Sequence, residues 1–256
     1  MGNVTRVMLL VIIILFASNY QTFAAPQSDR SYYEEKGDVV WEIKTKHQMV
    51  ALTFDDGPDI RYTNTILDLL AEHNASATFF VVGNRVKEAP EVAKRIIKEG
   101  NEIANHTNTH PNLSTLSQSE LDKEIKDAEQ AIFNVTGARP NLFRPPLGLY
   151  NDEIVHNIRE NDYIAVMWSW HQDTYDWRNP GVEAIVNKVL KNITNGDIIL
   201  FHDYGGDRSQ TVKALAIILP ELQKKGYQFV TVSELLKEDK KFQVPLMEIQ
   251  EKNERK

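Results

Sequence analysis

The stretch Met49-Val50-Ala51-Leu52-Thr53-Phe54-Asp55-Asp56-Gly57-Pro58 is the most informative segment of the chain. Its apolar start is typical of a buried strand, and two adjacent carboxylates follow at the end of that strand. Neighbouring carboxylates repel one another, so they persist where a cation or a proton-transfer task separates their roles. Gly57-Pro58 predicts a sharp turn that holds both side chains at a rim. Two solvated aspartates in a turn are the alternative interpretation, and other segments decide against it.

Short β-rich apolar runs alternate with longer segments of helical period along most of the chain. The predicted strands cover residues 49–54, 77–82, 102–105, 141–144, 163–170, 197–202 and 228–231. The predicted helices cover residues 62–73, 89–98, 117–136, 151–161, 180–194 and 209–225. Such a series of βα repeats predicts a parallel sheet in an α/β fold.

Side chains capable of chemistry fall at the carboxyl ends of different predicted strands. A closed barrel gathers all of its strand ends around one mouth, whereas an open sheet spreads them along a line. We therefore predict a (β/α) barrel. The clusters at strand ends are Asp55 with Asp56, His106 with His110, Arg144, Asp173 with Asp176, and His202 with Asp203.

The first 24 residues have the features of an export signal. Arg6 precedes an unbroken apolar stretch, residues 7–17, and Thr22-Phe23-Ala24 resembles a cleavage site for signal peptidase. The apolar stretch is too short for a comfortable membrane span. We therefore predict a signal peptide over 1–24, a secreted or cell-wall-associated mature protein, and no stable membrane insertion after cleavage. An uncleaved membrane anchor is the weaker alternative.

The remaining chain is long enough for one large domain. We predict a polar lead over 25–46, a single domain over 47–238 and a charged, loosely held tail over 239–256. The chain contains no cysteine, which excludes disulfides, thiolate metal sites and a cysteine nucleophile. Its formal charge of −7 disfavours nucleic acid as a partner and points to neutral or cationic partners.

Two histidines, His106 and His110, are spaced so that one turn or tight loop can aim both at one ion. With one carboxylate they would make a His-His-Asp site that leaves a coordination position open for water and substrate. Two unrelated surface histidines are the alternative, but the free Asp-Asp pair favours the metal site. His202 closes another strand and suits a general acid, because histidine titrates near neutral pH.

Five segments between Met49 and Leu236 resemble, in order, the polysaccharide deacetylases of carbohydrate esterase family 4, which carry the NodB homology domain. The resemblance implies a metal-dependent, distorted barrel of about seven strands that removes acetyl groups from N-acetylglucosamine polymers. The segments are Thr53-Phe54-Asp55-Asp56-Gly57-Pro58, His106-Thr107-Asn108-Thr109-His110, Arg144-Pro145-Pro146-Leu147-Gly148, Asp173-Thr174-Tyr175-Asp176-Trp177 and Leu200-Phe201-His202-Asp203.

The same resemblance implies a role for each matching residue of the centre. Asp55 corresponds to the general base and His202 to the general acid. Asp56, His106 and His110 correspond to the metal ligands. In the implied reaction, Asp55 takes a proton from the attacking water and His202 protonates the leaving amine.

The resemblance also implies supporting and substrate-contacting residues. Arg144 would pair with Asp55 and keep it ionised, and Asp176 would orient His202. Leu147 stands where the family usually has tyrosine, so a main-chain N–H there can still serve the oxyanion while contacts of the ring are lost. The predicted substrate-binding residues are Trp177, Leu147, Pro146, Tyr175 and Asp173.

The implied cofactor is a divalent metal ion, Zn²⁺ in the first place and Co²⁺ in the second. The implied partner is an acetylated glucosamine polymer, either peptidoglycan or a chitin-type glycan, from which acetate is released. Two alternatives stay open at this point: a polysaccharide O-acetyl esterase and a non-catalytic glycan-binding relative. His202 together with Asp176 favours amide hydrolysis, because an amine leaving group needs a strong acid.

Overall fold

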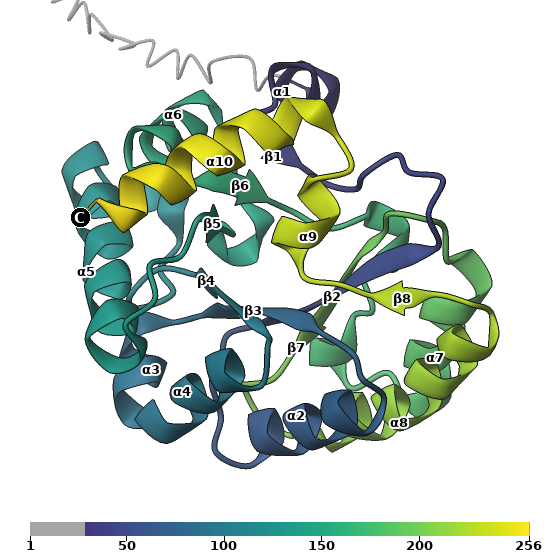
Figure 1. The fold of residues 1–256 in the computed structure, drawn as a ribbon. Coiled ribbons are helices and arrows are strands. Elements are labelled where there is room, and N and C mark those ends of the chain that lie inside the picture. Colours follow the sequence, from purple (N-terminus) through teal and green to yellow (C-terminus); the bar gives the residue numbers. More distant parts are fainter. Residues whose placement is uncertain (1–28, 256) are drawn as a thin grey trace, which may run out of the picture.

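Eight strands form one curved sheet within residues 29–255, the part of the chain that this computed structural model describes. Their order is β1-β6-β5-β4-β3-β2-β7, with β8 added to the start of β2, and every pairing between them is parallel. Figure 1 shows the sheet curled into a half-barrel, which confirms the predicted fold class. The strands are β1 (Val39–Val40), β2 (Met49–Asp55), β3 (Ala77–Val81), β4 (Glu102–Asn105), β5 (Leu142–Phe143), β6 (Ile164–Val166), β7 (Ile198–His202) and β8 (Gln228–Phe229).

Most of the helices lie around the outer face of the sheet (Figure 1). The α-helices are α1 (Arg30–Lys36), α2 (Tyr62–Glu72), α3 (Gly83–Glu88), α4 (Pro90–Lys98), α5 (Gln118–Thr136), α6 (Asp152–Glu160), α7 (Val182–Asn192), α8 (Ser209–Lys224), α9 (Val232–Leu236) and α10 (Lys240–Glu254). Short 3₁₀ helices cover η1 (Leu113–Thr115), η2 (Pro146–Gly148), η3 (Trp170–Gln172) and η4 (Asp176–Arg178). Within residues 29–255, no helix combines the length and apolarity that crossing a membrane requires.

β6 and β7 do not pair, and irregular backbone bridges the gap between them, which accounts for the distortion of the barrel. β6 ends at Val166, earlier than the sequence predicts, and the chain then runs alongside β7. The Ser169 amide donates to the Ile198 carbonyl at 3.0 Å, and Asp173 forms an isolated bridge with Leu200. This closing segment carries several predicted site residues to the rim of the barrel.

The chain beyond residue 238 differs from the loosely held tail expected from its charge. It forms α10, whose apolar side chains Phe242, Leu246 and Ile249 are buried with the residues that fill the barrel interior. α9 precedes it at the amino-terminal ends of the strands, where the Val232 amide donates to Thr78 at 2.8 Å. Because these apolar residues recur at helical spacing, burial of one face holds a helix that is otherwise highly charged.

The segment before β2 also differs from the polar lead that we expected. Residues 30–40 form α1 and β1, and Tyr33, Trp41 and Ile43 are almost completely buried. β1 pairs with β6 and so extends the sheet by one strand. Residues 1–24, the predicted signal peptide, lie outside the described residues.

The register of the sheet brings the ends of β2 and β7 together. Asp55 is paired with His202 across these two strands, and Phe54 stacks between Phe79 and Phe201 with ring centroids 5.0 and 5.6 Å away. The packed rings fix the strand positions from the outer side of the sheet. The predicted base and acid therefore emerge side by side at the carboxyl end of the barrel.

Candidate active site

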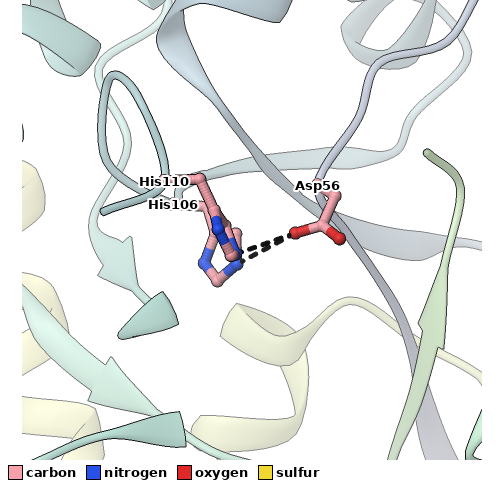
Figure 2. Close-up of side chains that lie close together, drawn as sticks. All are labelled: Asp56, His106 and His110. Atoms are coloured by element: carbon pink, nitrogen blue, oxygen red, sulfur yellow. Dashed lines mark ion pairs between the residues drawn. The ribbon is translucent and has the colours of Figure 1, made fainter. Parts of the chain in front are cut away.

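Asp56, His106 and His110 come together at the carboxyl end of the barrel. Oδ1 of Asp56 lies 3.1 Å from Nε2 of His110 and 3.5 Å from Nε2 of His106. Figure 2 shows both rings pointing at the same carboxylate. The three side chains each offer a ligand atom, and these atoms lie within 4.8 Å of one another. The geometry is that of a candidate centre for a divalent metal ion.

The loop that carries the two histidines is held by side chains that accept backbone N–H groups. Asn105 accepts from the Thr107 amide at 2.8 Å, Thr107 accepts from the His110 amide at 3.0 Å, and Glu124 accepts from the Asn108 amide at 2.9 Å. Thr107 and His110 adopt left-handed backbone angles, with φ of 68° and 60°. Such strain persists only where surrounding contacts enforce it, and it is common at functional sites.

The donor set fits a bound cation. Nδ1 of His106 donates to the Arg144 carbonyl at 2.7 Å, so in the neutral ring Nε2 presents its lone pair to Asp56. Oδ1 of Asp56 is buried and has no hydrogen-bond partner among the described residues. Two imidazole nitrogens and a carboxylate oxygen that face one point are well suited to hold a positive charge between them.

Asp55 lies beside this cluster and is bound by a fully buried arginine. Nη1 of Arg144 lies 2.7 Å from Oδ1 of Asp55, and it also donates to Thr53 at 2.9 Å. The rest of the guanidinium donates to the carbonyls of Val166 and Met167. The pairing predicted for Asp55 and Arg144 is therefore present. The arginine holds one carboxylate oxygen of Asp55. The other oxygen, Oδ2, faces the Asp56-His106-His110 cluster and lies 3.9 Å from Nε2 of His106.

His202 is oriented by Asp176, as the sequence predicts. Nδ1 of the ring lies 2.7 Å from Oδ1 of Asp176, whose other oxygen accepts from the His202 amide and from Thr211. Burial lowers the pKa of His202, but the hydrogen bond and charge of Asp176 outweigh burial and raise the pKa to about 9. Protonated His202 can therefore donate a proton at neutral pH.

Replacement of Asp176 by asparagine is expected to move the alkaline limit of the reaction to lower pH. Without the carboxylate, burial dominates and the pKa of His202 falls from about 9 toward or below its ordinary value of 6.5. The acid must be protonated to act, so kcat should begin to fall near neutral pH instead of near pH 9. A pH profile of kcat measures this shift. An exposed histidine, His156, supplies the control His156→Ala, and an unmoved alkaline limb in Asp176→Asn would contradict the role of the pair.

A cavity of about 330 Å³ opens over the cluster. Three of the predicted substrate-binding residues line this cavity: Leu147, Trp177 and Asp173. Pro146 is buried and Tyr175 is exposed, and neither is part of the lining. The complete lining consists of Asp55, Asp56, His106, His110, Leu147, Gly148, Trp168, Asp173, Trp177, Leu200 and His202.

Leu147 occupies the rim of this cavity with an exposed side chain. Its φ is 60°, and the following Gly148 approaches the Trp168 ring so closely that an added Cβ would lie 2.7 Å from it. Sequence reasoning missed Trp168 because it fell inside a predicted strand, whereas the strand ends before it. Because the turn passes so close to the indole ring, position 148 requires glycine. At position 147, leucine in place of a large aromatic ring leaves the rim of the cavity open.

The sequence also did not predict the structural roles of Thr53 and Asp203 next to the site. Thr53 links Arg144 to the Ile199 carbonyl, which it contacts at 2.7 Å. Asp203 is fully buried against Gly57, where an added Cβ would lie 2.3 Å from its carboxylate. Burial raises the pKa of Asp203 to about 7. Thr53 and Asp203 both belong to motifs recognised in the sequence. Only the structure shows that Thr53 contacts Arg144 and that Asp203 packs against Gly57.

The fold and this centre define a class of protein: an α/β half-barrel hydrolase with a candidate divalent-metal site at the carboxyl ends of its strands. A family profile described as polysaccharide deacetylase matches residues 42–166. A peptidoglycan-N-acetylglucosamine deacetylase of Bacillus cereus is 52% identical over 208 residues, which cover 81% of this chain and 97% of that protein. The chain therefore belongs to the polysaccharide deacetylase family.

Two more comparisons define its neighbourhood in that family. A chitooligosaccharide deacetylase of Sinorhizobium fredii is 38% identical, with 70% of this chain and 87% of the relative covered. The crystal structure of a peptidoglycan N-acetylglucosamine deacetylase, in complex with an N-oxidanyl-benzamide, superimposes with a TM-score of 0.77 at 36% identity. That alignment covers 81% of this chain and 96% of the other. The predicted family is thus confirmed by sequence and by structure.

Proposed function

We propose that this protein is a metal-dependent de-N-acetylase that hydrolyses the acetamide of N-acetylglucosamine residues in peptidoglycan and releases acetate. One observation carries the proposal: Asp55 and His202 are neighbours on paired strands, and both line one cavity with the Asp56-His106-His110 cluster. A base, an acid and a candidate metal centre around one space are what hydrolysis of an unreactive amide requires.

Asp55 and His202 have separate tasks in the proposed reaction. Asp55 accepts the proton of the attacking water, and Arg144 holds the carboxylate in place for that transfer. His202 donates a proton to the nitrogen of the leaving amine, and Asp176 keeps the imidazolium charged until then. The leaving amine needs this proton, which favours an amide substrate over an O-acetyl ester.

Asp56, His106 and His110 would hold the ion. Two imidazoles and one carboxylate favour Zn²⁺ or a neighbouring transition metal over Mg²⁺, which prefers oxygen ligands. When bound, such an ion supplies Lewis acidity to the acetamide oxygen and to water. The proposed identity of the ion is Zn²⁺, with Co²⁺ as a working substitute.

The proposed substrate follows from the relatives, of which two act, by their names, on peptidoglycan N-acetylglucosamine and one on chitooligosaccharides. We further propose that the protein is exported, because the sequence of residues 1–24 has the composition of a signal peptide. An exported enzyme meets the cell wall first. Removal of acetyl groups there exposes amines that are protonated at neutral pH and makes the wall more cationic.

Acetate release tests the function directly. The mature protein should release acetate from intact peptidoglycan and from chitooligosaccharides, and a chelator should stop the release. An O-acetylated, N-deacetylated glycan should not be a substrate, and preferential release of acetate from it would favour the esterase alternative. Muropeptides from a deletion strain should contain fewer glucosamine residues than those of the parent. An unchanged glucosamine fraction, with robust activity on chitin oligomers, would move the assignment to a chitooligosaccharide substrate.

A further inference from the structure

Arg178 differs from every other arginine of residues 29–255, because it is exposed and lacks a carboxylate partner. Arg208 also lacks one, but it is buried and donates to the backbone carbonyls of Tyr204 and Asp176. The arginines that pair with carboxylates are Arg30, Arg61, Arg85, Arg95, Arg139, Arg144, Arg159 and Arg255. An unpaired guanidinium stands out in a chain with a net charge of −7.

Two exposed aromatic rings hold the guanidinium of Arg178 in place. Its central carbon lies 4.4 Å from the ring centroid of Trp177 and 5.1 Å from that of Tyr175. The backbone is fixed as well, because the Arg178 amide donates to the Tyr175 carbonyl at 2.9 Å and the Asp176 side chain between them is buried and bound to His202. A planar cation stacked in this way is ordered before any ligand arrives.

This cation lies at the edge of the active site. Trp177 lines the same cavity as the Asp56-His106-His110 cluster, and its side chain is 47% exposed. The other neighbour of this ring is the guanidinium of Arg178. Lys188 adds a second positive charge over Tyr175 at 5.4 Å. The charge of Lys188 also acts on Asp173 in the cavity wall.

We propose that Arg178 binds a carboxylate on the sugar next to the N-acetylglucosamine that is deacetylated. Alternate sugars of peptidoglycan carry a lactyl carboxyl group or a peptide that ends in carboxylates, whereas chitin carries no anion. Trp177 offers a face for stacking of a sugar ring, and Arg178 offers the planar, two-pronged donor that matches a carboxylate. The pair therefore selects peptidoglycan over chitin. This inference rests on the proposed function, since it specifies the substrate of the same site.

Equilibrium binding to two tetrasaccharides of equal length tests the inference. One alternates N-acetylglucosamine with N-acetylmuramic acid and carries lactyl carboxylates, and the other is chitotetraose. Binding is measured in the Zn²⁺-loaded Asp55→Asn protein, where turnover is suppressed, and His202→Ala serves as a second background. Adding Arg178→Gln should raise the Kd for the carboxylate-bearing oligomer about three- to tenfold more than the Kd for chitotetraose. High salt should shrink this difference.

Matched variants separate recognition of charge from loss of structure. Arg178→Lys should keep part of the preference, because it retains the charge but not the planar fork. Arg255→Gln removes an exposed arginine just after α10 and should leave the ratio of the two Kd values unchanged. Equal effects of Arg178→Gln on both oligomers, or no effect on either, would overturn the inference. Amidation of the lactyl carboxylates should abolish the preference, and a preference that survives amidation would also overturn it.

The outcome is independent of the proposed reaction. If the unmodified enzyme released no acetate from either polymer while the Kd ratio still depended on Arg178, the reaction would be wrong and the carboxylate site would stand. If acetate were released from both polymers and the ratio ignored Arg178, the reaction would stand and the inference would fall.

Discussion

Asp55→Asn and His202→Ala are each expected to lower kcat by about 10²- to 10⁴-fold, the range that a positioned acid or base contributes. Both variants should keep a bound metal ion near one per chain, because neither side chain belongs to the ligand cluster. Asparagine retains an oxygen that can accept from Arg144, so the buried guanidinium keeps a partner. Turnover of a chitooligosaccharide and metal analysis by mass spectrometry measure the two effects.

The control for both variants is His156→Ala, which removes a histidine exposed on α6. Thermal unfolding of each variant shows whether a loss of activity is a loss of fold. If Asp55→Asn emptied the metal site and regained activity with excess metal, the roles of Asp55 and Asp56 would be exchanged. A rate within a factor of about two of the parent for His202→Ala would remove it from the role of general acid.

Removal of the metal ion is expected to abolish activity, and Zn²⁺ or Co²⁺ should restore it. The reason is the donor set, in which Oδ1 of Asp56 is buried without a hydrogen-bond partner between two imidazole nitrogens. Loss of one ligand in His110→Ala should weaken metal binding by at least about 100-fold, since even outer-shell partners contribute 10- to 100-fold. Metal affinity is measured by competition with a chromophoric chelator.

Mg²⁺ serves as the control ion, because its preference for six oxygen ligands disfavours this centre. His156→Ala serves again as the control variant. Full turnover by protein shown to be metal-free would refute the metal centre, and so would His110→Ala protein that binds Zn²⁺ as tightly as the parent.

The site could be predicted more fully than the fold, because its residues lie in short motifs at strand ends. The register of β2 against β7 then brings Asp55 and His202 together, as the barrel hypothesis required. The contacts of Arg144 with Asp55 and of Asp176 with His202 also match expectation. Both pairs were implied by the family resemblance of the motifs, whereas the barrel hypothesis alone predicts only that strand ends meet at one mouth.

The elements that the sequence did not reveal are short or depend on distant partners. β1 has only two residues and is defined by its pairing with β6. α10 is charged and contains Pro245, so its burial is visible only once the open end of the barrel is in place to receive it. Trp168 reaches the cavity because β6 ends early and the chain crosses to β7, a tertiary effect without a local pattern.

Helix α10 ties the closing of the barrel interior to a contact between segments that are far apart in the sequence. Phe242, Leu246 and Ile249 on α10 cover the apolar interior of the barrel. Lys241 on the same helix donates to the Glu34 carbonyl at 3.0 Å. The beginning and the end of the described chain therefore meet. The two residues are 207 positions apart in the sequence, so the interior closes only when a very long loop has formed. Loss of these contacts is therefore expected to destabilise the whole barrel and not the helix alone.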